Sequence, residues 1–276
     1  MRLVRPCLLA ALLAPAAPAL AQETDPPAPI TVSGSVTVAS DYRFRGISQT
    51  DKEVAVQGGV TIAHESGFYI GTWGSNLAGW GTFGGANLEL DLIAGYRLPL
   101  GGGTLDSGLT WYTYPGGVDE SDVVELYSRL SGTIGPASLT ASIAYAPPQN
   151  SLGYYTASLT PFVPGDGDKE DNLYLSGDGA MGVPETPLTL KAHIGYSDGN
   201  PGLCPNGTSL SPTGEYWDWS LGADLVFSGL TLNVSYVDTD IGRGEAAYLQ
   251  PNFSKGNDGT GPIADATLVV SLTAAL

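Results

Sequence analysis

The chain has 276 residues, of which 42% are hydrophobic, and carries 11 lysine and arginine residues against 28 aspartate and glutamate residues. The resulting net charge of −17 excludes the basic face that a nucleic-acid-binding protein needs, so no nucleic acid is expected as a partner. The hydrophobic content argues against disorder, and the 38 glycines favour closely paired strands.

The N-terminus has the features of a secretory signal peptide. Arg2 and Arg5 precede a short apolar run over residues 8–13, and Ala19 and Ala21 frame an A-x-A motif. This pattern predicts cleavage after Ala21 and export of the mature protein through the periplasm. The apolar run is too short to cross a membrane as a helix, so residues 1–21 are assigned to the signal peptide alone.

The mature chain is expected to begin with a short leader and to continue as one β-rich domain. Residues 22–29 are polar and rich in proline, which favours a disordered periplasmic leader before a domain formed by residues 30–276. Cleavage would remove Cys7 and leave Cys204 without an internal partner. No disulfide is therefore expected to stabilise the domain.

From residue 30 onward, apolar and polar residues alternate with the period of two that is typical of β-strands. The pattern is clearest at residues 216–240, where a tight turn joins two legs and Trp217 falls on the opposite face from Asp218 and Asp224. Each leg has about the 9–11 residues that a tilted strand needs to cross a bilayer. The same alternation predicts about twelve strands, at residues 30–39, 54–63, 68–76, 87–98, 104–114, 123–131, 138–146, 171–180, 188–196, 216–227, 230–238 and 265–276.

The connections between these strands alternate in length. Short turns are predicted at residues 64–67, 99–103, 132–137, 182–187 and 228–229. Long loops are predicted at residues 41–53, 77–86, 115–122, 147–170, 197–215 and 239–264. In the fourth of these loops, Pro147 and Pro148 are expected to end the preceding strand, and residues 154–160 are strand-like. Such sorting predicts an all-β fold, a single antiparallel up-and-down transmembrane β-barrel with short periplasmic turns and long extracellular loops.

Ionisable residues of the strands fall on the polar face, which in a barrel is the inner wall. Because isolated buried charges are costly, such a wall is expected to surround a hydrated lumen, and twelve strands predict a narrow one. The candidates for lining this pore are Asp91, Arg97, Glu125, Arg129, Lys191, His193 and Asp224. When Glu89, Asp106, Asp178 and Asp218 are included, seven acids face three arginine or lysine residues, which predicts a mild preference for cations.

The segment that follows the first strand resembles a motif of the TorF family of proteobacterial porins. It consists of Ser40, Asp41, Tyr42, Arg43, Phe44, Arg45 and Gly46, and continues as far as Asp51. The similarity extends to residues 196–199, 216–220 and 236–241 and so spans most of the mature chain. The resemblance implies an outer-membrane barrel that conducts small solutes, and it supplies no catalytic residues.

Two interpretations of the charges in this motif remain open. Arg43 and Arg45, with Asp41 and Asp51, could form a functional constriction at the outer mouth of the barrel. They could equally form a structural cluster of ion pairs that ties the first long loop to the acidic inner wall. The second interpretation is favoured, because networks of ion pairs are commonly structural.

The sequence favours a passive pore for small solutes or ions in the outer membrane of a Gram-negative bacterium, with membrane lipid as the other partner. The alternative is a plugged barrel that binds or anchors through its acidic outer loops. A lipid-modifying enzyme would need a serine within reach of a histidine at the lipid face, whereas His193 is predicted to face the lumen. The acidic run at residues 166–171 lacks the glycine and glutamate of an EF-hand. No catalytic residue, metal or cofactor is therefore assigned, and an oligomer is possible.

Overall fold

The computed structural model describes residues 29–78, 86–117, 121–152, 169–199, 214–242 and 263–276. The predicted signal peptide, nearly all of the predicted leader, the strand-like piece at 154–160 and Cys204 lie outside the described residues. Within the described parts of the chain, no helix is both long enough and apolar enough to cross a membrane.

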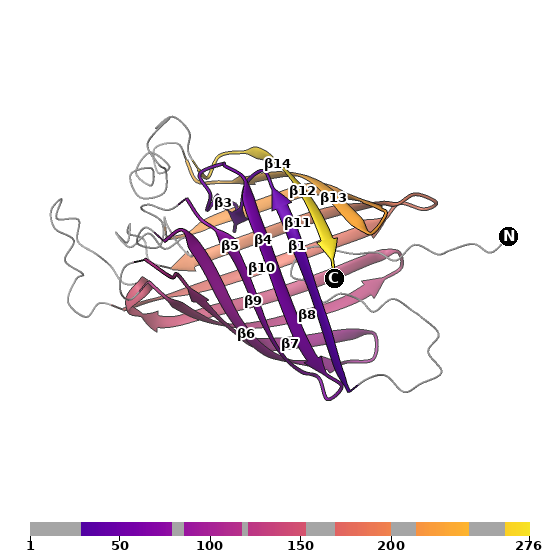
Figure 1. Cartoon of the computed structure of the whole chain (residues 1–276), viewed down its shortest axis with the longest axis horizontal. Helices are drawn as coiled ribbons and strands as arrows, with labels where there is room; N and C mark the ends of the chain where they lie inside the picture. The colour runs from indigo at the N-terminus through magenta and orange to yellow at the C-terminus, as the bar shows by residue number, and fades with distance from the viewer. Residues whose placement is uncertain (1–28, 79–85, 118–120, 153–168, 200–213, 243–262) are drawn as a thin grey trace.

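Twelve antiparallel strands form a closed barrel, as the alternation predicts (Figure 1). Each strand pairs with its neighbours in sequence, and the last strand closes the barrel by pairing with the first. The strands are β1 (Ile30–Ala39), β4 (Ala55–His64), β5 (Phe68–Asn76), β6 (Leu88–Pro99), β7 (Gly103–Thr113), β8 (Val123–Ile134), β9 (Ala137–Gln149), β10 (Glu170–Gly182), β11 (Leu188–Gly199), β12 (Tyr216–Phe227), β13 (Leu230–Thr239) and β14 (Thr267–Ala275). Two further short strands, β2 (Arg43–Phe44) and β3 (Ile47–Ser48), pair only with each other.

The alternation of apolar and polar residues along each strand places apolar side chains on the outer face of the barrel and polar side chains on the inner face. Along β12, Leu221 is 62% exposed, whereas Asp218 and Asp224 are buried. Most of the large hydrophobic residues of the barrel are exposed in the same way, and many buried residues are polar or charged. The arrangement is the reverse of a water-soluble protein, in which charged residues are mostly exposed.

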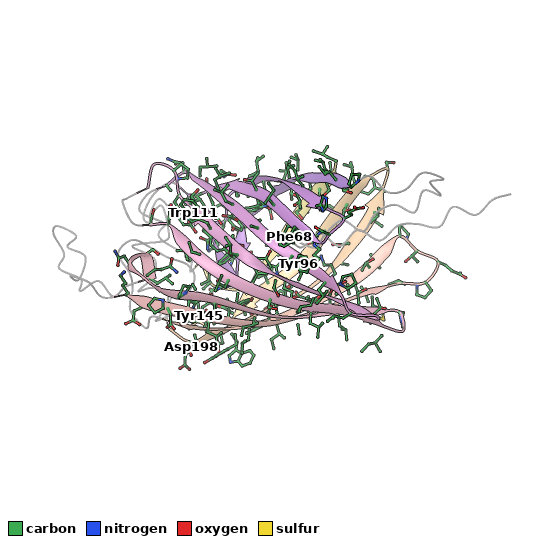
Figure 2. The ribbon with its side chains drawn as sticks, turned by 90° about the horizontal axis from the view of Figure 1, so that it is seen from below. Phe68, Tyr96, Trp111, Tyr145 and Asp198 are labelled. Atoms are coloured by element: carbon green, nitrogen blue, oxygen red, sulfur yellow. The ribbon has the colours of Figure 1, made fainter. Side chains whose placement is uncertain are left out.

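Outward aromatic side chains gather near both ends of the barrel. Trp111 and Tyr145 lie toward the end with the long loops, and Phe68 and Tyr96 lie farther along the axis (Figure 2). In β12, an exposed Trp217 stands near one end of the strand and Phe227 near the other, a separation of roughly 33 Å along the strand. At a strand tilt of about 40°, that distance corresponds to roughly 25 Å along the axis, which is the height of the apolar band of an outer-membrane barrel.

The predicted stop of the seventh barrel strand at Pro147 and Pro148 is wrong, because β9 continues to Gln149. Neither proline has an N–H to donate to β8. The side chain of Gln149 replaces the missing pairing, since its Oε1 accepts from the N–H of Val124 and its Nε2 donates to the carbonyl of Val124. Two prolines at this end of the strand are thus tolerated.

Candidate functional site

The first long loop does not lie outside the barrel as a simple connection. Its short strands β2 and β3 form a hairpin, which the hydrogen bond from the Gln49 N–H to the Tyr42 carbonyl extends by one residue at each end, and residues 42–49 are called here the inner hairpin. Arg45 and Gly46 form its two-residue turn, with φ angles of 49° and 81°. Positive φ at both positions is the geometry of a type I′ turn, which Gly adopts freely and a bulky residue only at a cost. Arg45 therefore needs compensating contacts to remain in this position.

The side chain of Arg45 supplies such contacts on two strands of the wall. Its Nη2 donates to Glu125 Oε2 of β8 at 2.6 Å, and its Nη1 donates to Asn172 Oδ1 of β10 at 2.8 Å. The guanidinium also lies over the ring of Tyr174, 4.0 Å from its centroid. Because the Arg45 and Glu125 side chains are only 6% and 4% exposed, this ion pair is shielded from water.

The turn of the inner hairpin rests against a different part of the wall. The hydroxyl of Tyr216, on β12, donates to the carbonyl of Arg45 at 3.2 Å. Gly46 approaches Thr239 of β13 and Asp218 of β12 so closely that a Cβ atom at this position would lie 2.9 Å from Asp218 Cβ. Ile47 is buried in an apolar cluster with Tyr216.

The base of the inner hairpin contacts a third part of the barrel. Arg43 Nε donates to Asp41 at 2.6 Å, and its Nη1 donates to the carbonyl of Ile263 at 2.7 Å. On the opposite side, the hydroxyl of Tyr42 donates to Glu89 of β6 at 3.2 Å. The ring of Phe44 packs edge-on against Tyr112 of β7.

Together, these contacts join the inner hairpin to β6, β7 and β8 on one side of the barrel and to β10, β12 and β13 on another. Figure 1 shows β3 near the end of the barrel from which the long loops extend. The inner hairpin therefore crosses the lumen at its long-loop end. The pieces of sequence on which the family resemblance rests, around Arg45, Tyr216 and Thr239, come together here.

Burial affects the acid–base chemistry of two hairpin groups. It raises the pKa of the Tyr42 phenol well above its ordinary value, and the neighbouring Glu89 carboxylate raises it further. Burial alone would lower the pKa of the Arg45 guanidinium, but the carboxylate of Glu125 more than offsets this, so the pKa is raised. The Tyr42 phenol stays neutral and Arg45 stays charged at every physiological pH.

Replacement of Gly46 with alanine is expected to displace the turn of the inner hairpin. The new Cβ would meet Thr239 and Asp218 in a backbone conformation that alanine rarely adopts. Such a misfit costs about 1–3 kcal/mol, and a chemical denaturation experiment in micelles should show a loss of that size. Alanine at Gly116, which also has positive φ but open space around it, is the matched control and should cost less. Equal losses at the two positions would contradict the close contact.

A second layer of charges lies on the inner wall nearer the short turns. Arg97 Nε is 3.4 Å from Asp106 Oδ2, and Lys191 Nζ is 3.4 Å from Asp224 Oδ2. The guanidinium of Arg129 lies over the ring of Tyr127 at 4.5 Å. Asp91 and Glu125 lie instead at the level of the inner hairpin, which forms the first layer. The predicted pore-lining residues thus share the inner wall but lie at two levels.

His193 lies between the two layers. Its Nδ1 is 2.7 Å from Asp178 Oδ1, and its Nε2 is 3.0 Å from the Tyr174 hydroxyl and 3.1 Å from Asp218 Oδ1. Both ring nitrogens are thus engaged by carboxylates or a phenol, and among the described residues neither contacts a serine or a cysteine. His193 is thus a hydrogen-bonding group of the inner wall. It contacts the hydroxyl of Tyr174, whose ring lies under the guanidinium of Arg45.

Sequence reasoning did not recognise the inner hairpin or its partners Asn172, Tyr174 and Tyr216. The signal that could have revealed the hairpin is the dipeptide Arg45-Gly46, because a residue followed by glycine between two short alternating runs is a two-residue turn pattern. The partners carried no such signal, since single polar or aromatic residues on the inner face occur along every strand.

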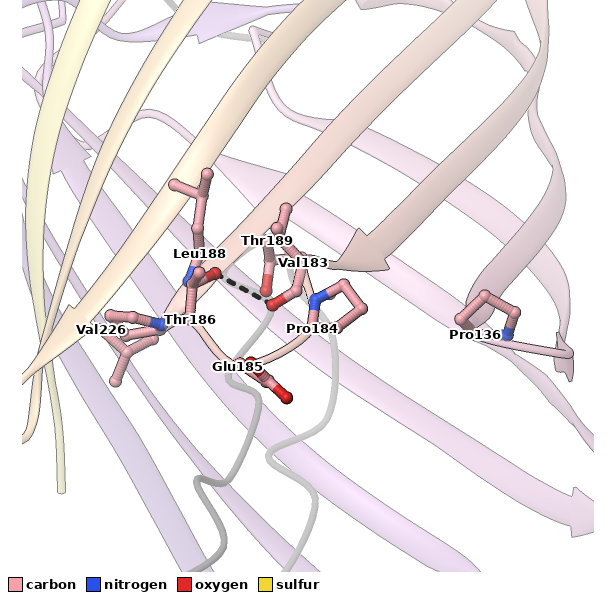
Figure 3. A pocket seen from close by; sticks show the side chains of 10 residues that line it. Pro136, Val183, Pro184, Glu185, Thr186, Leu188, Thr189 and Val226 are labelled. Atoms are coloured by element: carbon pink, nitrogen blue, oxygen red, sulfur yellow. Dashed lines mark hydrogen bonds between the residues drawn. The ribbon is translucent and has the colours of Figure 1, made fainter.

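A hollow of about 310 Å³ lies far from this site, beside the short turn that follows β10 (Figure 3). The turn is held by the hydroxyl of Thr186, which donates to the carbonyl of Val183 at 2.9 Å. Among the described residues that line the hollow, Glu185 is the one ionisable side chain. Its lining otherwise consists of proline, threonine, glycine and aliphatic side chains, so it offers no chemistry beyond a surface depression.

A family described as "Bacterial protein of unknown function (Gcw_chp)" matches residues 23–276. The matching family bears this name and not that of the TorF porins. No curated protein matches the chain. Among solved structures, the NanC porin aligns with a TM-score of 0.50 at 8% identity, over 89% of this chain and 98% of that one.

Two further solved structures align less well. The COG4313 outer membrane channel from Pseudomonas putida F1 aligns with a TM-score of 0.41 at 11% identity, over 92% of this chain and 99% of that one. The outer membrane channel DcaP of Acinetobacter baumannii aligns with a TM-score of 0.39 at 10% identity, over 89% of this chain and 96% of that one. At such low identities, the likeness to the NanC porin is one of fold alone.

Proposed function

We propose that this chain, which belongs to the Gcw_chp family, is an outer-membrane porin whose lumen is restricted at its outer mouth by the inner hairpin. The observation that carries the proposal is the closed barrel with an apolar outer face, a charged inner wall and a hairpin tied across its interior. Only a closed barrel or a helix satisfies its backbone groups in lipid, which is why this fold suits a bilayer. The similarity of its motif to TorF porins supports the same function.

The dimensions of the barrel support a narrow passage for small solutes or ions. Twelve strands spaced about 4.8 Å apart and tilted by about 40° enclose a circle roughly 24 Å across between backbones. Inward side chains take up about half of that width. The inner hairpin occupies much of the remaining space at its level, so the residual path runs beside it.

The charges of the wall support a mild preference for cations. Carboxylates outnumber lysine and arginine side chains among the described inward-facing residues, which comprise Asp41, Glu89, Asp91, Asp106, Glu125, Asp178, Asp218 and Asp224 against Arg43, Arg45, Arg97, Arg129 and Lys191. A ring of excess negative charge favours entry of cations over anions. The solutes themselves are the partners expected inside the barrel.

Outer-membrane lipid is the partner expected outside it. Replacement of Leu221 with arginine, in the middle of the apolar band, should destabilise the folded barrel in lipid by about 2–4 kcal/mol. On a water-exposed strand the same change would cost little. Unfolding in urea of the protein reconstituted in phospholipid bilayers measures the difference, with Lys52→Ala as a control outside the band. A loss below about 0.5 kcal/mol, which is typical of changes on a water-exposed surface, would argue against lipid at this face.

A non-conducting barrel that binds or anchors through its outer loops is the second candidate. It is favoured by one observation, the contacts of the inner hairpin with strands on opposite sides of the lumen. A lipid-modifying enzyme is least supported, because His193 is engaged inside the barrel.

Planar bilayers distinguish the two candidates. The porin should produce discrete conductance steps after insertion of the refolded mature protein, and a salt gradient should give a reversal potential of the sign expected for cation selectivity. Absence of steps from protein that is folded and inserted, as judged by circular dichroism and protease protection, would favour the plugged barrel.

A further inference from the structure

Two carboxylates on β6 differ from the other buried acids of the inner wall. Glu89 and Asp91 are two residues apart in the strand and so face the lumen together, and they are 2% and 4% exposed. Glu89 Oε1 accepts from Tyr42, but Glu89 Oε2 and Asp91 Oδ1 have no hydrogen-bond partner among the residues that the structure describes. Buried carboxylate oxygens are rarely left in this state, because an unsatisfied charged group is costly.

Neighbouring basic groups do not neutralise this pair. Arg45 is directed to Glu125 and Asn172, and Arg43 is directed to Asp41 and to backbone carbonyls. Across the described residues, no lysine, arginine or histidine lies within ion-pair distance of Glu89 or Asp91. Glu125 lies within electrostatic range of Asp91, but its own charge is paired with Arg45.

The described surroundings include phenols, apolar side chains and the buried Ser75, which lies opposite Glu89 on β5. Tyr42, Tyr112 and Tyr114 interact electrostatically with both carboxylates. Tyr42 and Tyr114 also belong to a buried cluster against which Trp73 and Tyr112 pack. A phenol oxygen is an additional neutral ligand for a cation, and the packed rings exclude bulk water, so a cation held here would be poorly screened.

We propose that Glu89 and Asp91 form a binding site for one small monovalent cation, an alkali-metal ion, on the lumen wall beside the inner hairpin. The cation would be coordinated by the two unpartnered oxygens and would offset the negative charge of the two carboxylates. In the described part of the chain, no group of three or more acidic, histidine or cysteine residues is arranged to hold a metal ion. Two carboxylates carry less negative charge than the carboxylate clusters that hold a divalent ion such as calcium, which favours a monovalent ion. An organic cation is too large for oxygens that are closed off from solvent.

The inference adds a binding site to the proposed porin and does not require the barrel to conduct. Its test is the thermal unfolding midpoint of the refolded protein in detergent micelles, measured in sodium or potassium chloride and in choline chloride at equal ionic strength. A ligand that binds only the folded state stabilises it. The wild-type midpoint should be roughly 2–4 °C higher in at least one alkali salt than in choline chloride.

Asp91→Asn and Glu89→Gln should each abolish the difference between the salts. Glu65→Gln removes one negative charge from an exposed turn and should retain the difference. If Asp91→Asn does not fold, Glu89→Gln provides the same comparison. A wild-type midpoint that is the same in all three salts, or a difference that persists in a folded variant of the pair, would overturn the proposal. Bilayer conductance is measured separately, so a silent barrel would contradict the porin and leave this site standing.

Discussion

Arg45→Ala should lower the free energy of unfolding by about 3–5 kcal/mol, the loss expected when one partner of a buried ion pair is removed. The substitution would leave the Glu125 carboxylate, which is nearly inaccessible to solvent, without its 2.6 Å partner. It would also remove the hydrogen bond to Asn172 and the contact with the ring of Tyr174. Urea unfolding in micelles, monitored by tryptophan fluorescence, measures the change in the free energy of unfolding.

The double variant Arg45→Ala with Glu125→Gln separates the charge from the rest of the contact. Because glutamine leaves no uncompensated charge, the double variant should be more stable than Arg45→Ala alone. Arg97→Ala is the matched control, since the Arg97 and Asp106 side chains are 26% and 13% exposed and solvent screens that pair. A loss in Arg45→Ala no larger than in Arg97→Ala would contradict a buried tie between the hairpin and β8.

Arg45→Ala should also raise the single-channel conductance several-fold. Arg45 holds the turn of the inner hairpin against β8 and β10, so its removal frees the hairpin to leave the cross-section of the lumen. The guanidinium is also a positive charge in the hairpin that crosses the lumen, and its loss should shift the reversal potential toward stronger cation selectivity. Lys52→Ala removes the same charge from an exposed position of the same loop and should leave the conductance unchanged.

The barrel itself could be predicted from the sequence because the physical cause of its strands is local. In a strand between lipid and a polar lumen, apolar and polar side chains must alternate. The faces of Trp217, Asp218 and Leu221 can therefore be predicted from their own polarity, without information about the neighbouring strands. Loop lengths then give the direction of each strand. The wrong stop at Pro147 arose because the compensating group is the side chain of Gln149, whose hydrogen bonds to Val124 depend on pairing with another strand.

The site was less predictable because it depends on contacts between distant segments. The motif around Arg43 and Arg45 was noticed, and a tie to the acidic wall was one of its two interpretations. The partner of Arg45 could not be named, since Glu125 is one of several inward acids and its selection depends on how the hairpin folds back into the barrel. The unpartnered oxygens of Glu89 and Asp91 are likewise visible only in three dimensions.

If the inner hairpin restricts an otherwise open barrel, its effect is measured by a side-by-side recording of wild type, Arg45→Ala and Lys52→Ala in planar bilayers at one salt concentration. We expect small discrete steps from the wild type and from Lys52→Ala, and steps several-fold larger from Arg45→Ala. Equal steps from all three folded proteins would contradict it, because the hairpin would then have no part in limiting the passage.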